Sequence, residues 1–361
     1  MGFLRLLLAT LVLTSHAGVA PIFTGVLAVE CFYAISGFYI QLVISEQYRG
    51  QPRWVLRFYE SRALRIYVPY WIILGMIAIL SLLLRAPMTP LPLITLFHQA
   101  PLSGDAWIAL LSNLFIVGTE EFKLIRILDS CGSFFWSQQI IQPAWSVGVE
   151  LLFYAIAPFM LRLSTRSLVL IVAATACAKY ALLSGLAELI FFRTTPCADG
   201  LLNGIVPLEM GVFCAGALCY RFYRHYHTVL KERYWLWITL ITIMTAEALW
   251  GMSVNDAITP MVTFHCYALG ITLTLPFLFA ASRTLRYDRL VGEISYPFYL
   301  AHIFIINHLP LPMDGWKQYP SCALKWLVTV AVSYVIVRCV EKPLSRFRHR
   351  HFRTNHRPTE V

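Results

Sequence analysis

Arg5 and His16 are the residues whose types and spacing most directly suggest chemistry. They lie eleven residues apart within residues 3–20, a stretch that is otherwise apolar and typical of a membrane span. Ionisable side chains inside such a segment are costly, and a functional role is the default interpretation of them. At ~3.6 residues per turn both would lie on one helix face, separated by ~16 Å along the axis. The spacing predicts a polar stripe that faces a protein interior.

The same segment fits two simpler roles. An apolar run followed by the small residues at 17–20 also occurs in secretory signal peptides. Against this, Arg5 is the only basic residue ahead of the apolar core, and the chain becomes apolar again almost at once. A histidine such as His16 can also be held between helices by hydrogen bonds without taking part in any reaction.

Glu30 is the candidate partner of His16. It lies within the second apolar stretch, residues 22–44, and only a few residues join the two stretches, so we expect the two side chains at comparable depth. In a low-dielectric site such a pair fixes the imidazole tautomer and raises its basicity, which prepares a general base. The alternative is a structural ion pair that joins two helices. Ser36 and Gly37 favour close helix packing.

Arg62 and Arg65 form a second basic feature, just before the third apolar stretch. Three residues apart, they would share one face of a helix. Two guanidinium groups on one face suit the binding of phosphate groups. The alternative is the excess of basic residues that marks the cytoplasmic segments of any multi-pass membrane protein.

Polar residues also follow helical spacing at the start of the fourth apolar stretch. Ser146, Glu150 and Tyr154 recur every four residues and would share a face, with Trp145 as an anchor at the outer interface. Glu150 would be a second carboxylate within the bilayer, in the same outer half as Glu30. We expect Glu150 to act with His16, and Trp145 and Ser146 to contribute to substrate binding.

A further polar stripe lies in the ninth apolar stretch, where Ser295, Tyr299 and His302 share a helix face. We assign Tyr299 and His302 to substrate binding, although a role in hydrogen-bonded helix packing accounts for His302 equally well. His265 and His308 are interpreted as structural. Together with Arg5, His16, Glu30 and Glu150, these stripes predict a polar interior reached from a basic inner mouth.

The composition sets the fold class. Of the 361 residues 58% are hydrophobic and 13% charged, whereas a soluble domain is ~45–50% apolar with ~25% charge. We predict an all-α, polytopic helical bundle with both termini cytoplasmic, because that orientation keeps the arginine-rich segments inside. The net charge of +10 is then explained without nucleic-acid binding. Ten stretches have spanning length: residues 3–20, 22–44, 67–84, 145–161, 167–186, 201–220, 234–251, 259–281, 290–309 and 322–340.

Shorter features complete the prediction. Residues 107–118 are too few to cross comfortably and are expected to form a re-entrant or interfacial segment on the outer side. The nine cysteines show no CxxC or Cys/His spacing, so no metal site is predicted. Cys131 and Cys197 fall in outer segments and could pair in an oxidising compartment. The basic tail, residues 344–361, would lie against anionic lipid headgroups.

Six local patterns occur along the chain in order: Arg5 with His16; Glu30 before Ser36 and Gly37; Arg62 and Arg65 before Pro69; Trp145 and Ser146 before Glu150; Ser295 and Tyr299 before His302; and Glu341 before Lys342 and Pro343. Each pattern is weak alone. Together they resemble the acyltransferase-3 family of integral-membrane O-acyltransferases, over nearly the whole chain. The resemblance implies one membrane domain, residues 1–343, followed by the basic tail.

The resemblance also implies a function. Such a protein would move an acyl group, usually acetyl, from cytosolic acyl-CoA, its co-substrate, to a hydroxyl of a surface or secreted polysaccharide or its lipid-linked precursor. It would lie in the bacterial cytoplasmic membrane, alongside glycan-synthesis machinery. Arg5 and His16 match the catalytic motif, and Arg62 and Arg65 match residues that face the CoA phosphates. Two rival hypotheses remain: a proton-coupled transporter of acyl groups or glycolipids, and an inactive scaffold.

Overall fold

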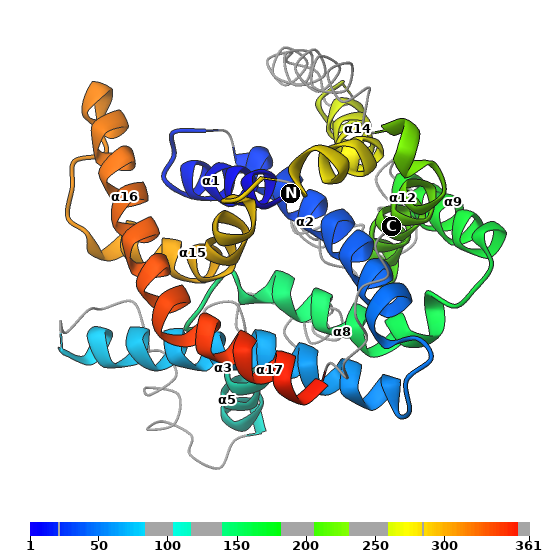
Figure 1. Cartoon of the computed structure of the whole chain (residues 1–361). Coiled ribbons are helices and arrows are strands. Elements are labelled where there is room, and N and C mark those ends of the chain that lie inside the picture. Colours follow the sequence, from blue (N-terminus) through cyan, green and yellow to red (C-terminus); the bar gives the residue numbers. More distant parts are fainter. Residues whose placement is uncertain are drawn as a thin grey trace. The chain divides into compact units, whose positions relative to one another are not determined.

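The described part of the chain is mainly helical (Figure 1). The computed structural model describes residues 1–20, 22–83, 104–116, 139–181, 206–230, 259–283 and 285–352. Within these ranges every regular element is a helix, which confirms the all-α prediction. The chain forms two compact units, the first from Met1–Leu42 and Phe159–Gly292, the second from Val43–Pro158 and Glu293–Val361.

Several helices are long and apolar enough to cross a membrane. Within the described ranges four qualify, namely Gly25–Tyr48, Trp54–Leu83, Asp288–His308 and Gly315–Phe347. Shorter apolar helices accompany them, as expected for a multi-pass membrane protein. The predicted span at 234–251 lies outside the described residues, so the count of ten spans and the cytoplasmic location of both termini stay predictions.

The described residues of the first unit include α1 (Gly2–His16), α2 (Ile22–Val43), α9 (Thr165–Ala181), α12 (Val206–Leu230), α14 (Thr259–Ser282) and the first residues of α15 (Asp288–His308). Helix α12 packs against both α9 and α14. The side chains that α9 buries are Leu168 and Lys179, and much of the rest of its surface is exposed. An apolar exposed face of this kind suits contact with lipid.

Helices α2 and α12 approach each other closely through two glycines. A Cβ added at Gly37 would lie 1.9 Å from the carbonyl oxygen of Phe213, and one added at Gly216 would lie 1.9 Å from that of Ala34. Only glycine allows this approach, which is a common device for packing helices within membranes. The packing role predicted for Gly37 is therefore confirmed.

The second unit contains α3 (Trp54–Leu83), the longest helix among the described residues. Its elements are the π-helical turn η1 (Ile44–Tyr48), α3 (Trp54–Leu83), α5 (Gly104–Phe115), α8 (Ala144–Met160), most of α15, the 3₁₀ turn η3 (Gly315–Lys317), α16 (Gln318–Ile336), the π-helical turn η4 (Val337–Glu341) and α17 (Lys342–Phe352). The predicted basic tail is helical as far as Phe352, where α17 ends.

Helix α5 corresponds to the short segment predicted at 107–118. Its twelve residues span ~18 Å, well short of the ~30 Å hydrocarbon core. The last carbonyl groups of a helix lack partners within it, and α3 supplies donors for those of α5. The side chains of Tyr67, Tyr70 and Trp71 donate hydrogen bonds of 2.6 to 2.7 Å to backbone oxygens at the end of α5. The residues directly before α5 and those directly after Ile116 lie outside the described ranges, so the re-entrant or interfacial assignment of this segment stays a prediction.

Candidate active site

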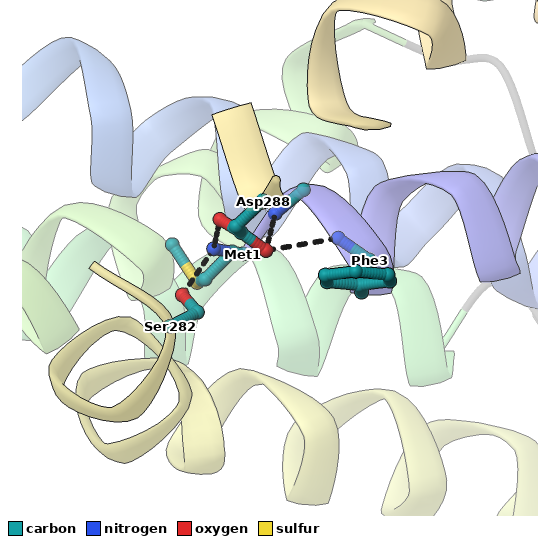
Figure 2. A network of polar contacts seen from close by, with 5 residues as sticks. Met1, Phe3, Ser282 and Asp288 are labelled. Atoms are coloured by element: carbon teal, nitrogen blue, oxygen red, sulfur yellow. Dashed lines mark hydrogen bonds and ion pairs between the residues drawn. The ribbon is translucent and has the colours of Figure 1, made fainter. Parts of the chain in front are cut away.

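Helix α1, which carries Arg5 and His16, is fixed at its first residues by Asp288 (Figure 2). The Asp288 carboxylate accepts hydrogen bonds from the Met1 amino group at 2.6 Å and from the backbone N–H groups of Gly2 and Phe3 at 2.7 and 3.1 Å. The Met1 amino group also donates to the Ser282 hydroxyl. A carboxylate from a distant helix thus satisfies the donors that a helix N-terminus leaves open.

The close approach of α1 to Asp288 requires glycine at position 2. A Cβ there would lie 1.7 Å from the Asp288 carbonyl oxygen and 2.7 Å from the backbone nitrogen of Gly292. Backbone atoms cannot give way as a flexible side chain can, so any larger residue would push α1 off the start of α15. The axial position of α1 is therefore set by direct backbone contact.

The other end of α1 closes in a Schellman motif around Gly18. The backbone N–H of Gly18 donates to the carbonyl of Ser15 at 3.1 Å, and that of Val19 donates to Thr14 at 3.0 Å. Gly18 has a φ of +71°, the left-handed conformation that favours glycine at this position. The small residues at 17–20 thus end the helix immediately after His16.

Arg5 and His16 lie on one unbroken helix, as their spacing predicts. Arg5 is half-buried, whereas His16, the last residue of α1, is exposed. An exposed imidazole can be reached by a substrate, and the carboxyl end of a helix stabilises positive charge. The position of His16 at the end of α1 therefore allows contact with a substrate.

Helix α2 returns from α1 with Gly25 beside Ser15. A Cβ at Gly25 would lie 2.9 Å from the Ser15 hydroxyl oxygen. Glu30 lies five residues further along α2, or ~7.5 Å along its axis. The end of α1 therefore meets the first turn of α2 rather than the turn that carries Glu30, and the assignment of Glu30 as the partner that orients His16 stays a prediction.

Glu30 takes part in a buried ion network that spacing alone does not suggest. The Lys179 ammonium on α9 donates to the Glu30 carboxylate on α2 and, at 3.0 Å, to the Glu209 carboxylate on α12. The residues are only 4%, 5% and 0% exposed for Glu30, Lys179 and Glu209. We call these three residues the triad. It ties three helices of the first unit together.

Lys179 and Glu209 are functional candidates that local sequence patterns do not reveal. Each is a charge inside a predicted span, 167–186 and 201–220, and that is itself a usable signal. Neither belongs to a recognisable short pattern with Glu30, because the three lie on three separate segments. Their pairing depends on how α9 and α12 pack on α2.

In the second unit α8 and α15 bring together two predicted binding residues. The hydroxyl groups of Ser146 and Tyr299 lie 2.7 Å apart, and Ser146 also donates to the Pro143 carbonyl at 3.1 Å. Further along α8 from Ser146, the Tyr154 hydroxyl donates to the Glu150 carboxylate. The bond between Tyr154 and Glu150 shows that these two side chains share a helix face, as their spacing predicts. Trp145 is half-buried in the first turn of α8.

His302 lies one turn beyond Tyr299 on α15 and is completely buried. Its Nδ1 lies 2.6 Å from the Tyr299 carbonyl oxygen, which fixes the ring within its own helix. Of the two interpretations of His302, this geometry favours the packing role. His308 makes a comparable contact, with Nδ1 2.9 Å from the Phe304 carbonyl.

Arg62 and Arg65 differ in accessibility although both lie on α3. Arg62 is 8% exposed, and its guanidinium carbon lies 5.8 Å from the centre of the Phe58 ring. Among the described residues its buried Nε atom has no hydrogen-bond partner. Arg65 is half-buried. Arg65 is therefore the more accessible of the two for a phosphate group.

The predicted site residues thus divide between the two units. Arg5, His16 and Glu30 belong to the first, whereas Arg62, Arg65, Trp145, Glu150 and the Ser146–Tyr299 pair belong to the second, with His302. Cys131 and Cys197, predicted as a candidate disulfide, lie outside the described residues, as does the side chain of His265.

A helical protein with several apolar helices of spanning length and with ionisable side chains buried among its helices has features of a membrane-embedded enzyme. Comparison with known families agrees. The profile described as an acyltransferase domain, that of the acyltransferase-3 family, matches residues 1–338. The chain belongs to this family of membrane acyltransferases. No curated protein and no solved structure matches the chain.

Proposed function

We propose that this protein is an O-acyltransferase that moves an acyl group, acetyl in the first instance, from cytosolic acyl-CoA to a hydroxyl of a surface or secreted polysaccharide or its lipid-linked precursor. Its location would be the bacterial cytoplasmic membrane. The family match over residues 1–338 supports acyl transfer. The donor, the acceptor and the acetyl group are parts of the proposal that rest on the resemblance.

The observation that carries the proposal is the placement of Arg5 and His16 on one helix that is fixed at both ends. Asp288 holds the first turn of α1, and the Schellman motif at Gly18 closes the last. A catalytic group must hold its geometry through the reaction. An arginine and a histidine ~16 Å apart on such a helix suit an extended donor whose acyl end reaches the histidine.

In the proposed reaction His16 is the general base. Its imidazole removes the proton from the acceptor hydroxyl, whose oxygen attacks the thioester carbonyl carbon. The carbon–sulfur bond then breaks, the new ester forms, and the coenzyme leaves as a thiolate that takes up a proton. A covalent acyl-His16 intermediate is the other route, in which the imidazole nitrogen attacks the carbonyl first. Glu30 or Glu150 is proposed to orient the imidazole.

The acyl-CoA phosphates are proposed to bind Arg65 and Arg62 on the cytoplasmic side. Arg65, the more accessible of the pair, would make the first contact, and the Nε donor of Arg62 would be available deeper in the second unit. Trp145, Ser146, Tyr299 and His302 are proposed to contribute to acceptor binding, with His302 acting through packing.

The test is product formation by purified protein in detergent, with labelled acetyl-CoA and glycan extracted from a strain that lacks the protein. Transfer of label to the glycan supports an enzyme, because no gradient exists in detergent. Binding of acetyl-CoA without transfer, together with label uptake by reconstituted vesicles, would support the proton-coupled transporter instead. The absence of both acetyl-CoA binding and label transfer would support the inactive scaffold.

A further inference from the structure

We infer that the triad of Glu30, Lys179 and Glu209 is a proton-binding site in which Glu209 is held as a neutral carboxylic acid. Neither the proposed reaction nor the family match assigns a role to Lys179 or Glu209, and the inference does not depend on the acyl-transfer proposal. It follows from the geometry and the charge count of the three side chains.

The triad contains more carboxylate groups than ammonium groups. Two carboxylates surround one ammonium group, so three ionised side chains would leave a net charge of −1 in a part of the unit where every member is at most 5% exposed. An uncompensated buried charge is strongly unfavourable. One additional proton makes the triad neutral. Its arrival turns one carboxylate into an acid and leaves a single ion pair.

The geometry indicates which carboxylate carries the proton. Lys179 donates to Oε1 of both glutamates, so both of those oxygens are occupied as acceptors. Among the described residues the Oε2 atom of Glu209 is buried without a hydrogen-bond partner, and the residue has no exposed surface. A carboxylate oxygen in such a place is far costlier than a hydroxyl group. Oε2 of Glu209 is therefore the site of the proton.

Within the described ranges, no further charged group near Glu209 changes this count. Arg221, the next basic residue along α12, is twelve residues away, or ~18 Å along the axis. The titratable side chains on the described parts of the elements packed against this part of α12 are neutral apart from the triad itself: Cys177 and Tyr180 on α9, Cys31 and Tyr33 on α2, and Tyr267 on α14. Within the part of the chain that the structure describes, neutrality is therefore reached only through the triad's own protons.

The experiment is infrared spectroscopy of the purified full-length protein in detergent at neutral pH, reading the C=O stretch of protonated carboxylic acids and its shift in heavy water. The charge count predicts that the number of acids equals the carboxylates of the triad minus its ammonium groups. Wild type should show one triad acid. Both Glu209→Gln and Glu30→Gln should show none, since the remaining glutamate is then ionised opposite Lys179. Lys179→Met should show two.

Two results would overturn the inference. One is a wild-type spectrum that coincides with that of Glu209→Gln in the carboxylic-acid region, since no proton would then reside on Glu209. The second is an acid band that persists in Glu30→Gln, which contradicts the charge count. Size-exclusion profiles confirm that each variant is folded. Should Lys179→Met fail to fold, the comparison of the two glutamine variants with wild type decides alone, because glutamine matches the neutral acid in size.

Discussion

The hydroxyl groups of Ser146 and Tyr299, 153 residues apart in the sequence, lie 2.7 Å apart in a buried hydrogen bond between α8 and α15. In the sequence they belong to separate polar stripes. Their contact makes the two stripes parts of one polar centre in the second unit, with Glu150 one turn along α8 and hydrogen bonded to Tyr154. The packing of α8 on α15 thus depends on polar as well as apolar contacts.

This contact predicts coupled effects on stability. Ser146→Ala and Tyr299→Phe should each cost about 1 kcal/mol, the usual value of one hydrogen bond. Because both remove the same bond, the double variant should cost clearly less than the sum. Apparent melting temperatures in detergent measure this, with Tyr319→Phe, an exposed tyrosine of the same unit, as the control. Strict additivity would show that the two hydroxyls do not interact.

Asp288 should be required for the stability of α1. Asp288→Ala removes the acceptor for the Met1, Gly2 and Phe3 donors and should cost about 1–2 kcal/mol, as does loss of a helix cap. Asp288→Asn keeps one acceptor oxygen and should cost less. Because α1 carries Arg5 and His16, acyl transfer should fall along with stability. Asp314→Ala, at an exposed aspartate, is the matched control, and an equal effect there would contradict the anchoring role.

The glycine contacts between α2 and α12 give a prediction with an internal control. Gly216→Ala places a Cβ 1.9 Å from the Ala34 carbonyl oxygen, so the helices must separate at a cost of about 1–3 kcal/mol. Gly75→Ala in α3 meets nothing within 4 Å and should be neutral or stabilising by up to about 1 kcal/mol. Thermal unfolding of the two variants tests this. Equal melting temperatures would mean that the close approach is absent.

Substitutions of the two arginines of α3 should affect acyl-CoA binding and protein stability to different degrees. Arg65→Ala should raise KM for acyl-CoA about tenfold or more, the loss of one charge-assisted hydrogen bond, with little change in melting temperature. Arg62→Ala should also lower the melting temperature, because Arg62 is packed on Phe58 inside the second unit. Arg49→Ala, which removes the same charge at an exposed site, is the control. An unchanged KM in Arg65→Ala would rule out the phosphate contact.

Local sequence patterns predicted the parts of the fold that depend on local spacing. The eleven-residue interval between Arg5 and His16 falls on one continuous helix, and the four-residue spacing of Glu150 and Tyr154 places their side chains in a hydrogen bond on one helix face. The shortness of the segment at 107–118 likewise corresponds to the twelve-residue α5. Helical periodicity is a property of neighbouring residues, so one sequence is enough to show it.

Contacts between distant segments could not be predicted in this way. The cap on α1 comes from Asp288, a residue whose own surroundings give no sign that it will bind a backbone 286 residues away. The partner of Glu30 is Lys179, on a helix 149 residues further along, and no spacing rule connects them. A charge inside each apolar stretch signals that a partner must exist, while the identity of that partner depends on helix packing.

The central claim, that His16 carries acyl transfer to a glycan, is tested most directly by mass spectrometry of surface and secreted glycan. The cells compared would carry wild-type protein, a deletion, His16→Ala, or His225→Ala at an exposed histidine of the same unit. The account predicts that one acyl group per repeat is lost in both the deletion and His16→Ala and is kept in His225→Ala, with equal protein levels. Full acylation in His16→Ala, with loss in the deletion, would contradict it.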